Sequence, residues 1–549
     1  MKRLFFAISF LGIALVAGAQ NIYDAANFSQ NQYYGTARTL GLSNAVTAVG
    51  GDLGTIGINP AGSAVAGYSQ FTITPGLTIS STSTAYSPVG AESFEGDYRQ
   101  SNTRFVVPNV GFSLNIDTGN EWGVKNYTFA FVSNRTNTYH NFFSGFGSNK
   151  YTSRFAELAS GATTWQCNPA YLNEYNSYYQ NNGDWDLITA YRSNLFSEFN
   201  EDNEFAGNSE VLSSDKTYHY VPGALNQAAE VRRYGYKNDL VFNFGANVND
   251  IFYFGFNLGI PQAMYRYDEL YSESAQNPDL FPIDFLDGST CFRAGSLDYS
   301  YSTSISGIYG KLGAIVLPTS GLRIGLAFQT PALYTVKEAW DYAASSSYVD
   351  SYYSCRKESP LGEYSYRLRT PYVLDAGIAY TIGPIGLISF DYELMDYSIM
   401  RFKTVGYDSG ADIFRELNQA VPSVMGASHS FRAGTEWKLI PAFAVRAGAS
   451  FILTPEHNGP DTYYKDRVRS FTLGFGYSSE GSFFADFAFR MSDYIYGDNF
   501  MQRQFYAPYY DYGHYDSYGN FYLQSEEPSP ILAVGRKLFD ATLTMGWRF

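Results

Sequence analysis

Side chains that could perform chemistry are present in this chain, but their spacing assembles no catalytic or metal site. The histidines show neither the H-x-x-x-H nor the E-x-x-H spacing that holds a metal on a helix. The three cysteines lack the C-x-x-C spacing of metal or redox sites. They could form one disulfide and leave one thiol, or all three could be unpaired, and the sequence allows both states. These residues are His140, His219, His429, His457, His514, Cys167, Cys291 and Cys355. We therefore predict a protein that is not an enzyme and has no metal site and no cofactor.

Charged side chains instead occupy alternate positions in apolar segments. Asp391 and Glu393 point to one face of an expected strand, and Arg432 and Arg446 lie on the inward faces of nearby strands. Because charge is costly against lipid, we expect ion pairs in an interior rather than a catalytic carboxylate pair. The predicted inward-facing polar residues are Arg323, Arg367, Arg369, Asp391, Glu393, Arg432, Glu436, Arg446, Asp486 and Arg490.

The elements that position these charges are segments of roughly ten residues with period-two alternation, the length that a tilted membrane strand requires. In the last segment Phe539, Leu543 and Phe549 share one face, and Asp540 and Arg548 lie on the other. Single-chain barrels have an even strand number, and fourteen segments fit this rule. They cover 70–80, 103–116, 124–135, 236–248, 251–267, 297–316 (with a bulge near Gly307), 322–328, 366–382, 388–394, 431–439, 443–451, 471–477, 483–489 and 539–549. The terminal Phe549 resembles the signature that outer-membrane barrels present to their assembly machinery.

The length of each connection depends on whether it follows an even-numbered or an odd-numbered segment. Those after even strands are short: 117–123, 249–250, 317–321, 383–384, 440–441 and 478–482. Those after odd strands are all longer, up to the excursion 136–235. Short periplasmic turns that alternate with long external loops are the rule for membrane barrels, whereas a soluble sandwich has no reason to sort its loops. The sequence therefore predicts a periplasmic location for Phe549 and for the mature N-terminus.

The N-terminus predicts export. Lys2 and Arg3 precede an apolar run over 4–16, and Ala17-Gly18-Ala19 fits an A-x-A cleavage site. The run is too short to cross a bilayer, so we expect a signal peptide over 1–19, cut between Ala19 and Gln20. With 18% aromatic residues, the composition suits a lipid-facing barrel in the bacterial outer membrane. The net charge of −15 argues against nucleic acid.

The long excursion 136–235 and two loops leave alternatives open. Trp185, Ile188, Tyr191 and Leu195 have helical spacing after a possible cap at Asp184, so we expect an amphipathic helix on the barrel mouth or a partner-binding helix. The tyrosine-rich tract 506–522 predicts a self-packed loop or a stacking surface for glycans or greasy ligands. The acidic cluster 200–204 predicts a solvated loop or a Ca²⁺ site.

The segment 20–69 before the first strand carries Gly35-Thr-Ala-Arg38, Gly41-Leu-Ser-Asn-Ala45, Ala48-Val-Gly-Gly-Asp52 and Ile58-Asn-Pro-Ala-Gly62. This segment resembles the N-terminal hatch of the FadL/TodX family, outer-membrane transporters of long-chain fatty acids and other hydrophobic compounds, and fourteen strands are associated with that family. Segments 323–331, 369–372 and 386–392 are also similar. The resemblance implies a hatch over 20–69 inside a barrel over 70–549. Its ligand-proximal motif residues would be Gly50, Gly51, Asp52, Asn59, Pro60, Ala61 and Gly62.

For function, the resemblance implies passive uptake of hydrophobic small molecules such as long-chain fatty acids. A ligand would enter among the external loops, bind next to 59–62 and leave through a distorted strand in the wall. The third strand has neither Pro nor internal Gly, so Pro75-Gly76 and Pro108 are the candidate kinks. The alternatives are an interaction barrel that docks secretion or surface-assembly partners through 136–235, and a nonspecific porin. The expected partners are outer-membrane lipid and lipopolysaccharide, the ligand and the assembly machinery, around a monomer.

Overall fold

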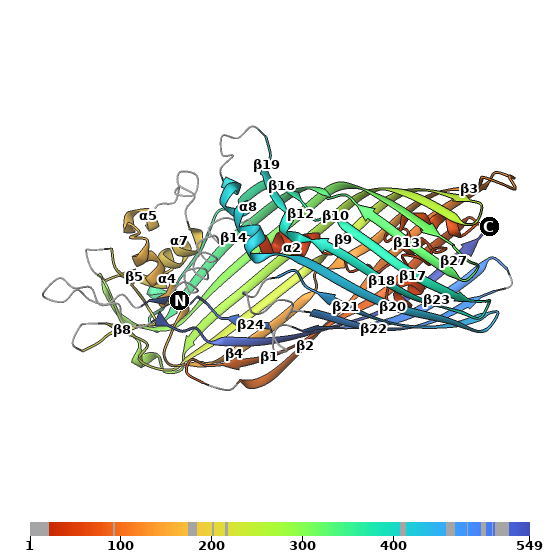
Figure 1. Cartoon of the computed structure of the whole chain (residues 1–549). Helices are drawn as coiled ribbons and strands as arrows, with labels where there is room; N and C mark the ends of the chain where they lie inside the picture. Colours follow the sequence, from red (N-terminus) through yellow and green to blue (C-terminus); the bar gives the residue numbers. More distant parts are fainter. Residues whose placement is uncertain are drawn as a thin grey trace, which may run out of the picture.

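The structure is a computed structural model that describes residues 21–91, 94–173, 184–199, 203–214, 218–406, 413–456, 467–479, 481–495, 501–507, 509–510 and 526–549. The expected signal peptide 1–19 and the cleavage site at Ala19 and Gln20 lie outside these residues. Within them, fourteen antiparallel wall strands form a closed barrel, because β27 (Ile531–Arg548) returns to pair with β1 (Gln70–Ser87) (Figure 1). The predicted all-β architecture and strand number are confirmed.

Several wall strands consist of two pieces that continue one another across a short break. In order around the barrel the wall contains β1, β2 (Glu95–Asp117), β3 (Val124–Thr138) with β4 (Asn141–Asn149), β9 (Leu225–Val248), β10 (Phe252–Ala275), β12 (Gly288–Val316), β13 (Leu322–Gln329) with β14 (Leu333–Tyr348), β16 (Gly362–Arg369) with β17 (Val373–Ile382), β18 (Gly386–Asp396) with β19 (Arg401–Thr404), β20 (Ala427–Ile440), β21 (Phe443–Leu453), β22 (Arg467–Ser478), β23 (Phe483–Ile495) with β24 (Met501–Gln504), and β27.

The remaining elements lie in the lumen or at the barrel end that carries the long loops. The helices are α2 (Ile22–Ser29), α3 (Ala37–Gly41), η1 (Leu53–Thr55), η2 (Pro60–Val65), α4 (Arg154–Thr164), α5 (Pro169–Asn173), α7 (Trp185–Arg192), η3 (Pro278–Leu280), η4 (Ser351–Tyr353), η5 (Tyr397–Ile399) and α8 (Ile413–Val424). The short strands are β5 (Phe196–Glu198), β6 (Phe205–Gly207), β7 (Val211–Leu212), β8 (His219–Tyr220), β11 (Pro282–Phe285), β15 (Cys355–Glu358), β25 (Tyr509–Tyr510) and β26 (Glu526–Glu527).

The six short turns occur where the parity of the loops predicts them, and they share one barrel end with Phe549 (Figure 1). We call this the turn end and the opposite one the loop end. The strands extend further toward the loop end than predicted. In particular β9 begins at Leu225, so the excursion is shorter than 136–235. The bulge expected near Gly307 is absent, because β12 keeps one register with β14 through Gly307, and the ladder to β10 is interrupted at Pro261 instead.

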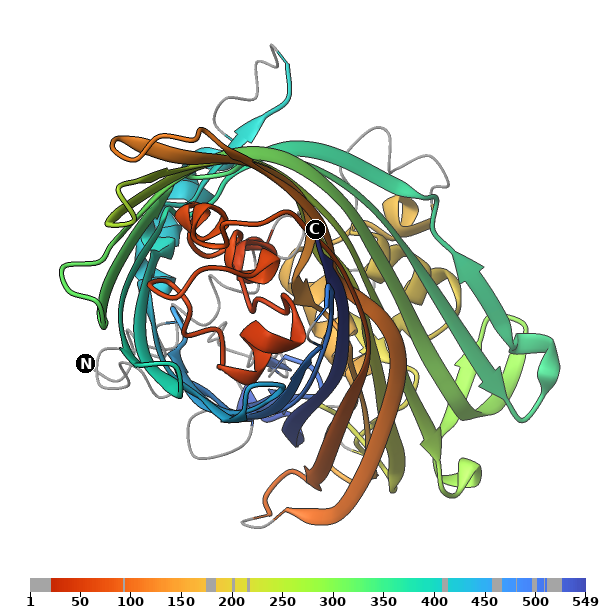
Figure 2. The same cartoon turned by 90° about the vertical axis from the view of Figure 1, so that its right-hand side faces the viewer.

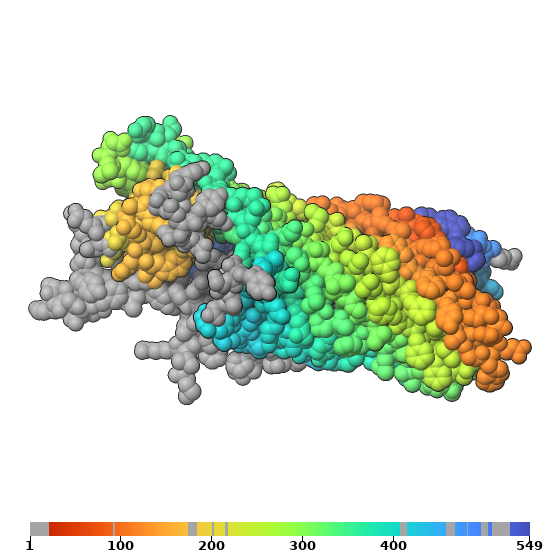
Figure 3. All heavy atoms as spheres, turned by 90° about the horizontal axis from the view of Figure 1, so that it is seen from above, coloured from red at the N-terminus to blue at the C-terminus, as the bar shows by residue number. Residues whose placement is uncertain are grey.

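The outer face of the wall is apolar around the barrel. Side chains alternate in direction along each strand, so one set of large apolar residues points outward while polar and small residues point into the lumen. Among the exposed apolar residues are Phe112, Leu114, Phe129, Phe131, Phe242, Phe254, Phe256, Leu326, Phe328, Ile378, Phe390, Phe431, Phe471, Leu473, Phe487 and Leu543. Figure 3 shows the continuous outer surface of the slanted strands. Among the described residues, no helix has the length and apolar character needed to cross a membrane.

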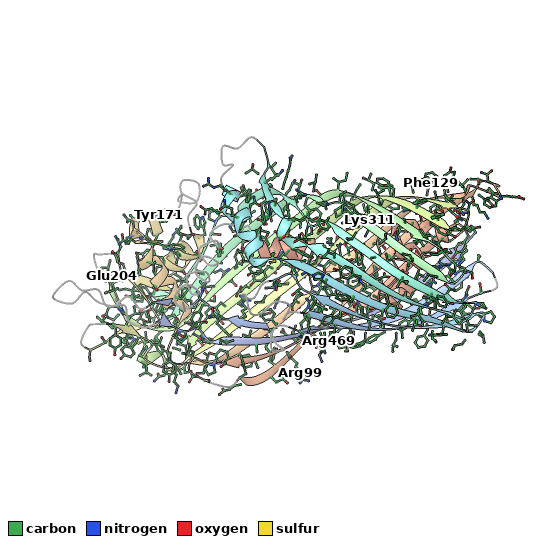
Figure 4. The ribbon with its side chains drawn as sticks, in the orientation of Figure 1. Arg99, Phe129, Tyr171, Glu204, Lys311 and Arg469 are labelled. Atoms are coloured by element: carbon green, nitrogen blue, oxygen red, sulfur yellow. The ribbon has the colours of Figure 1, made fainter. Side chains whose placement is uncertain are left out.

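Helices α4, α5 and α7 form a cap at the loop end, where Tyr171 and Glu204 also lie (Figure 4). The helix expected around 184–196 is present as α7, and its Trp185 and Ile188 are buried against Tyr348 of β14 and neighbouring residues. The amphipathic helix on the barrel mouth is therefore confirmed. Asp184 occupies the N-cap position but makes no side-chain cap hydrogen bond, so that detail of the prediction is wrong.

Candidate functional site: the barrel lumen

The N-terminal segment, residues 21–69, lies inside the barrel and occupies its lumen (Figure 2). It has little regular structure, so its buried backbone groups need partners from elsewhere. The wall supplies them. Arg323 donates to the Val49 carbonyl at 2.7 Å, Ser389 donates to the Ala45 carbonyl at 2.6 Å, and Thr47 N–H donates to the Asp391 carboxylate at 2.7 Å. Arg323 and Asp391 thus point inward and hold this segment.

One buried ion-pair network joins α3 to three wall strands. Arg38 of α3 donates two hydrogen bonds to Glu436, at 2.9 and 3.2 Å. Glu436 also accepts from Arg446 at 2.6 Å, and Arg446 in turn donates to Asp486 at 2.6 Å. Three of the predicted lumen-facing residues therefore meet at one site. Because a buried charge without its partner is strongly destabilising, the network resists displacement of α3.

A second network surrounds the ring of Tyr33. Lys311 pairs with Asp375 at 2.9 Å, and both side chains are fully buried (Figure 4 labels Lys311). Arg432 pairs with Glu393 at 2.8 Å, and its guanidinium lies 5.3 Å from the centre of the Tyr33 ring. The inward set of residues did not include Lys311. The sequence signal for Lys311 is its place in the alternation of the predicted strand 297–316, but the bulge predicted near Gly307 would shift the phase and so hides that signal.

Arg490 forms the third anchor. It pairs with Asp540 at 2.8 Å, donates to the carbonyls of Gln32 and Tyr33 at 3.2 Å, and lies 4.4 Å from the Tyr34 ring centre. A planar guanidinium suits this combination of carboxylate, carbonyl and aromatic partners. Arg490 thus contacts each of residues 32–34 from the wall.

Arg367 and Arg369 correct the prediction, because both are exposed on the outer face of β16. The predicted strand 366–382 runs through a break at Thr370-Pro371-Tyr372, where Pro371 cannot donate to a ladder. The phase of alternation changes across this break. Asp375 therefore faces the lumen although its parity matches that of the two arginines.

The Asn59–Gly62 motif packs tightly against the wall. Asn59 donates to the Thr47 carbonyl at 2.8 Å and to the Ala314 carbonyl at 3.2 Å, and its side chain caps η2 by accepting from Ala61 N–H. The wall presents glycine at the contact. A Cβ at Gly313 would stand 2.0 Å from the Asn59 side-chain oxygen, and one at Gly255 would stand 2.2 Å from the Pro60 carbonyl carbon. In this conformation the motif is packed directly against the wall at these two glycines.

The Gly50-Gly51-Asp52 turn is a further part of this packing. Both glycines have positive φ, and Gly51 N–H donates to the Gly62 carbonyl at 2.8 Å. Asp52 caps η1 by accepting from Gly54 N–H at 2.8 Å, and it accepts from the Thr36 hydroxyl at 2.6 Å. The ligand-proximal role that the resemblance implies for these residues stays a prediction.

A packed cluster rich in tyrosines lies above this region, toward the loop end, and α2 is enclosed by it. Phe28 of α2 packs edge-on against Tyr139 and Tyr265, with ring centres 6.3 and 5.5 Å apart. Glu338 in the wall accepts hydrogen bonds from the hydroxyls of Tyr301 and Tyr366 at 2.5 and 2.9 Å. Other buried members of the cluster include Ile22, Ala25, Ala26, Ala263, Ile305, Tyr309, Tyr334, Val336, Leu368, Phe402 and Phe414. We call this cluster the tyrosine chamber.

The wall has a break between β2 and β3. Their ladder runs from Asp117 only to the Asn109–Asn134 pair and ends there beside Pro108, whereas β1 and β2 stay paired up to Glu95. The free edge of β3 is taken by the N-terminal segment. Gln32 N–H donates to the Thr136 carbonyl at 2.7 Å and Tyr34 N–H donates to the Arg135 carbonyl at 3.0 Å. Residues 32–34 therefore cover the break from the lumen side.

Nearer the loop end, β1 and β4 close the wall with side-chain bonds. Thr82 and Thr84 of β1 donate to the carbonyls of Phe142 and Ser144 at 2.5 and 2.6 Å. The break is thus confined to a short stretch between the Asn109–Asn134 pair and these threonines. Pro108, one of the candidate kink sites, marks its lower limit.

No group of His, Cys, Asp and Glu among the described residues could hold a metal ion. Cys167, Cys291 and Cys355 are all free thiols at the loop end, and of the acidic cluster 200–204 only Asn203 and Glu204 are described. The tyrosine-rich tract lies mostly outside the described residues.

In the cap, burial raises the pKa of Glu157 to about 7, although Arg154, 2.7 Å away, acts in the opposite direction.

A closed barrel with an apolar outer belt and a polar, occupied lumen defines an integral outer-membrane protein. Its sequence matches no family model and no curated protein. Solved structures with a similar arrangement include a FadL homologue of Pseudomonas aeruginosa (12% identity, TM-score 0.46, covering 94% of this chain and 98% of that one). They also include the CymD monoaromatic hydrocarbon channel (11%, 0.45, 95% and 98%) and the toluene transporter TbuX of Ralstonia pickettii (14%, 0.42, 91% and 95%).

Proposed function

We propose that this barrel carries hydrophobic small molecules, of the class of long-chain fatty acids, passively across the outer membrane. The ligand enters at the loop end, displaces α2 from the tyrosine chamber, and leaves sideways through the break between β2 and β3. The single observation that carries the proposal is the position of residues 32–34 on the free edge of β3. One shift of the N-terminal segment would empty the chamber and uncover the break.

The chemistry of the chamber supports an apolar ligand with one polar end. Its walls are aromatic and aliphatic, and α2 fills it with Ile22, Ala25 and Phe28. Glu338 and the hydroxyls of Tyr301 and Tyr366 supply a polar group on one side. Pockets of this composition bind ligands mainly through apolar burial, and the few polar groups fix orientation. A lateral exit delivers such a ligand to hydrocarbon without a watery channel.

A reversible lock on α2 tests the proposal. The Ser29 hydroxyl contacts the Met400 sulfur at 3.7 Å. A Ser29→Cys/Met400→Cys pair, with the three native cysteines changed to serine, can therefore be joined by a short bis-methanethiosulfonate reagent, whose two reducible disulfides tether α2 to the wall. We expect uptake of a fluorescent fatty acid by cells to fall when the crosslink forms and to recover on reduction. The single Ser29→Cys variant is the matched control. Undiminished uptake with the crosslink fully formed would rule the proposal out.

One observation favours docking of a partner protein as a second function. The cap exposes large apolar side chains, including Tyr151, Trp165 and Phe199. Because β4 and β9 are wall strands, the informative deletion replaces only 151–221 with a short linker. Lost partner co-purification with retained fatty-acid uptake would support the docking role. Lost uptake with no partner in the parent protein would argue against it.

A further inference from the structure

Four basic side chains gather on the outer face of three neighbouring wall strands. They are Lys337 on β14, Arg367 and Arg369 on β16, and Lys403 on β19, and all four are exposed. We call them the outer basic cluster. The strands pair directly, with Arg367 opposite Lys403 and Lys337 opposite Ser365. The cluster is therefore one continuous patch.

The arrangement is unfavourable for the protein alone. Like charges directly opposite one another on a sheet destabilise it, and here Arg367 faces Lys403 while Arg369 faces Arg401. Among the described residues, no carboxylate forms an ion pair with any member of the cluster, although the chain carries a net charge of −15. Glu363 and Asp341, on the same strands nearer the loop end, make no such pair. An anion from outside the chain would balance this charge.

The position of the cluster along the barrel axis, relative to the apolar belt, indicates the kind of anion. Below Arg369 on the same wall strand, the outward residues Leu374, Ile378 and Tyr380 belong to the apolar belt. At about 3.3 Å per residue along a strand tilted by about 40°, Arg369 lies roughly 28 Å above Tyr380, which matches an apolar band of about 25 Å. The cluster therefore lies where the hydrocarbon ends and lipid headgroups begin, on the loop side.

A hollow on the outer face lies below the cluster, nearer the turn end. Its volume is about 680 Å³, and its lining includes the small side chains of Ala376, Ala433 and Ala449 together with the rings of Phe390 and Phe431. Two of its strands, β13 and β17, continue directly into β14 and β16, which carry the cluster. An acyl chain that extends down from a headgroup on the cluster would reach this hollow.

We propose that the outer basic cluster binds the phosphates of a lipopolysaccharide molecule in the outer leaflet, with acyl chains of the same molecule in the hollow. Guanidinium groups match phosphate oxygens with paired hydrogen bonds, and basic patches at headgroup level select anionic lipids. The transported ligand takes no part in this site, since the cluster faces away from the lumen.

The test uses full-length protein in mild detergent, stripped of lipid and titrated with deep-rough lipopolysaccharide, with bound lipid measured by native mass spectrometry. We expect Arg367→Gln/Arg369→Gln to weaken binding by about a hundredfold or more, since two charge-assisted contacts are lost. The matched control is Arg232→Gln/Arg266→Gln, two outward arginines that already pair with Glu230 and Asp268. It should bind within a factor of about two of the parent protein.

Three comparisons make the result decisive. Dephosphorylated lipid A should bind as weakly to the parent protein as the phosphorylated form binds to the double variant. Equal binding of both forms, or undiminished binding by Arg367→Gln/Arg369→Gln, would overturn the proposal. An anionic glycerophospholipid that binds as tightly as lipopolysaccharide, or inorganic phosphate that displaces it at equal concentration, would also overturn it, because the site would then not be selective for lipopolysaccharide.

Discussion

At the scale of single residues, buried charges attach a segment with little regular secondary structure to the barrel wall. Lys237 of β9 shows how one side chain does this. Its ammonium donates to the Phe28 and Gln30 carbonyls at 3.2 and 2.5 Å and to the Asn31 side chain at 2.9 Å. These acceptors lie at the C-terminal end of α2, where a positive charge also favours the helix dipole. The lysine therefore holds α2 in the tyrosine chamber.

We expect Lys237→Met to loosen α2 while the barrel stays folded. Hydrogen bonds from a charged donor contribute about 1.5–3 kcal/mol, so amide exchange in 22–31 should accelerate roughly ten- to a hundredfold. Hydrogen–deuterium exchange with mass spectrometry measures this. Lys125→Met is the control, because Lys125 pairs with Asp250 at the exposed turn end. Unchanged exchange in 22–31 would show that Lys237 does not hold the helix.

At the scale of elements, inward glycines shape the wall to the N-terminal segment. Gly245, Gly255 and Gly313 are cross-strand neighbours on β9, β10 and β12, and each is so close to residues 59–64 that a Cβ would clash. Glycine inside a strand marks such a close approach of another backbone. The sequence shows that these glycines lie in predicted strands. Only the structure shows that residues 59–64 pack against them.

We expect Gly313→Leu to displace η2 from the wall, because the new side chain would occupy the position of Asn59. Limited proteolysis should then cut within 44–66 in folded protein, whereas the parent resists. Gly310→Leu is the matched control, since Gly310 lies on the same strand with open space at its Cβ apart from one distant ring atom. Equal resistance of both variants would contradict the packing described for Asn59.

The cap should respond to pH through Glu157. Its pKa is raised from 4.5 to about 7 by burial, so the folded cap binds this proton more readily than the unfolded chain does. The contribution to stability is fully present below about pH 4.5 and is lost as the pH rises through about 7. We expect amide exchange in 154–164 to speed up between pH 5 and 8 beyond its intrinsic change, and Glu157→Gln to abolish that excess. An identical excess in the variant would assign it to another group.

At the scale of the whole molecule, different parts of the chain close the barrel wall and fill its lumen. The barrel closes through β27 and β1, and the Ser69 and Phe549 backbones exchange hydrogen bonds at 3.2 and 3.0 Å. The filling comes from residues 21–69, which precede the wall in sequence and add no strand to it. Removal of the filling should therefore leave the wall intact.

We expect deletion of 21–66 to turn the barrel into an open pore, because a fourteen-stranded wall encloses more space than its own side chains fill. Planar-bilayer conductance should be small for the parent protein and should rise by at least about tenfold in the deletion variant. Heat-modifiable mobility on gels checks that the variant is folded. Equal conductance of the two proteins would indicate that the N-terminal segment does not block the lumen, as a porin would require.

The sequence by itself determined the barrel, its strand number and the end that carries the turns. Alternation and loop parity are local patterns, and strands that must satisfy every backbone bond in lipid have few other solutions. Only the tertiary structure decided which charges meet, that Arg367 and Arg369 face outward, and that residues 32–34 cover the break beside Pro108. The first physical reason is that a break such as the one at Pro371 changes which face of the strand the next residues occupy, and the composition of the strand does not reveal this change. The second is that an irregular segment contacts the wall at positions that follow no sequence period.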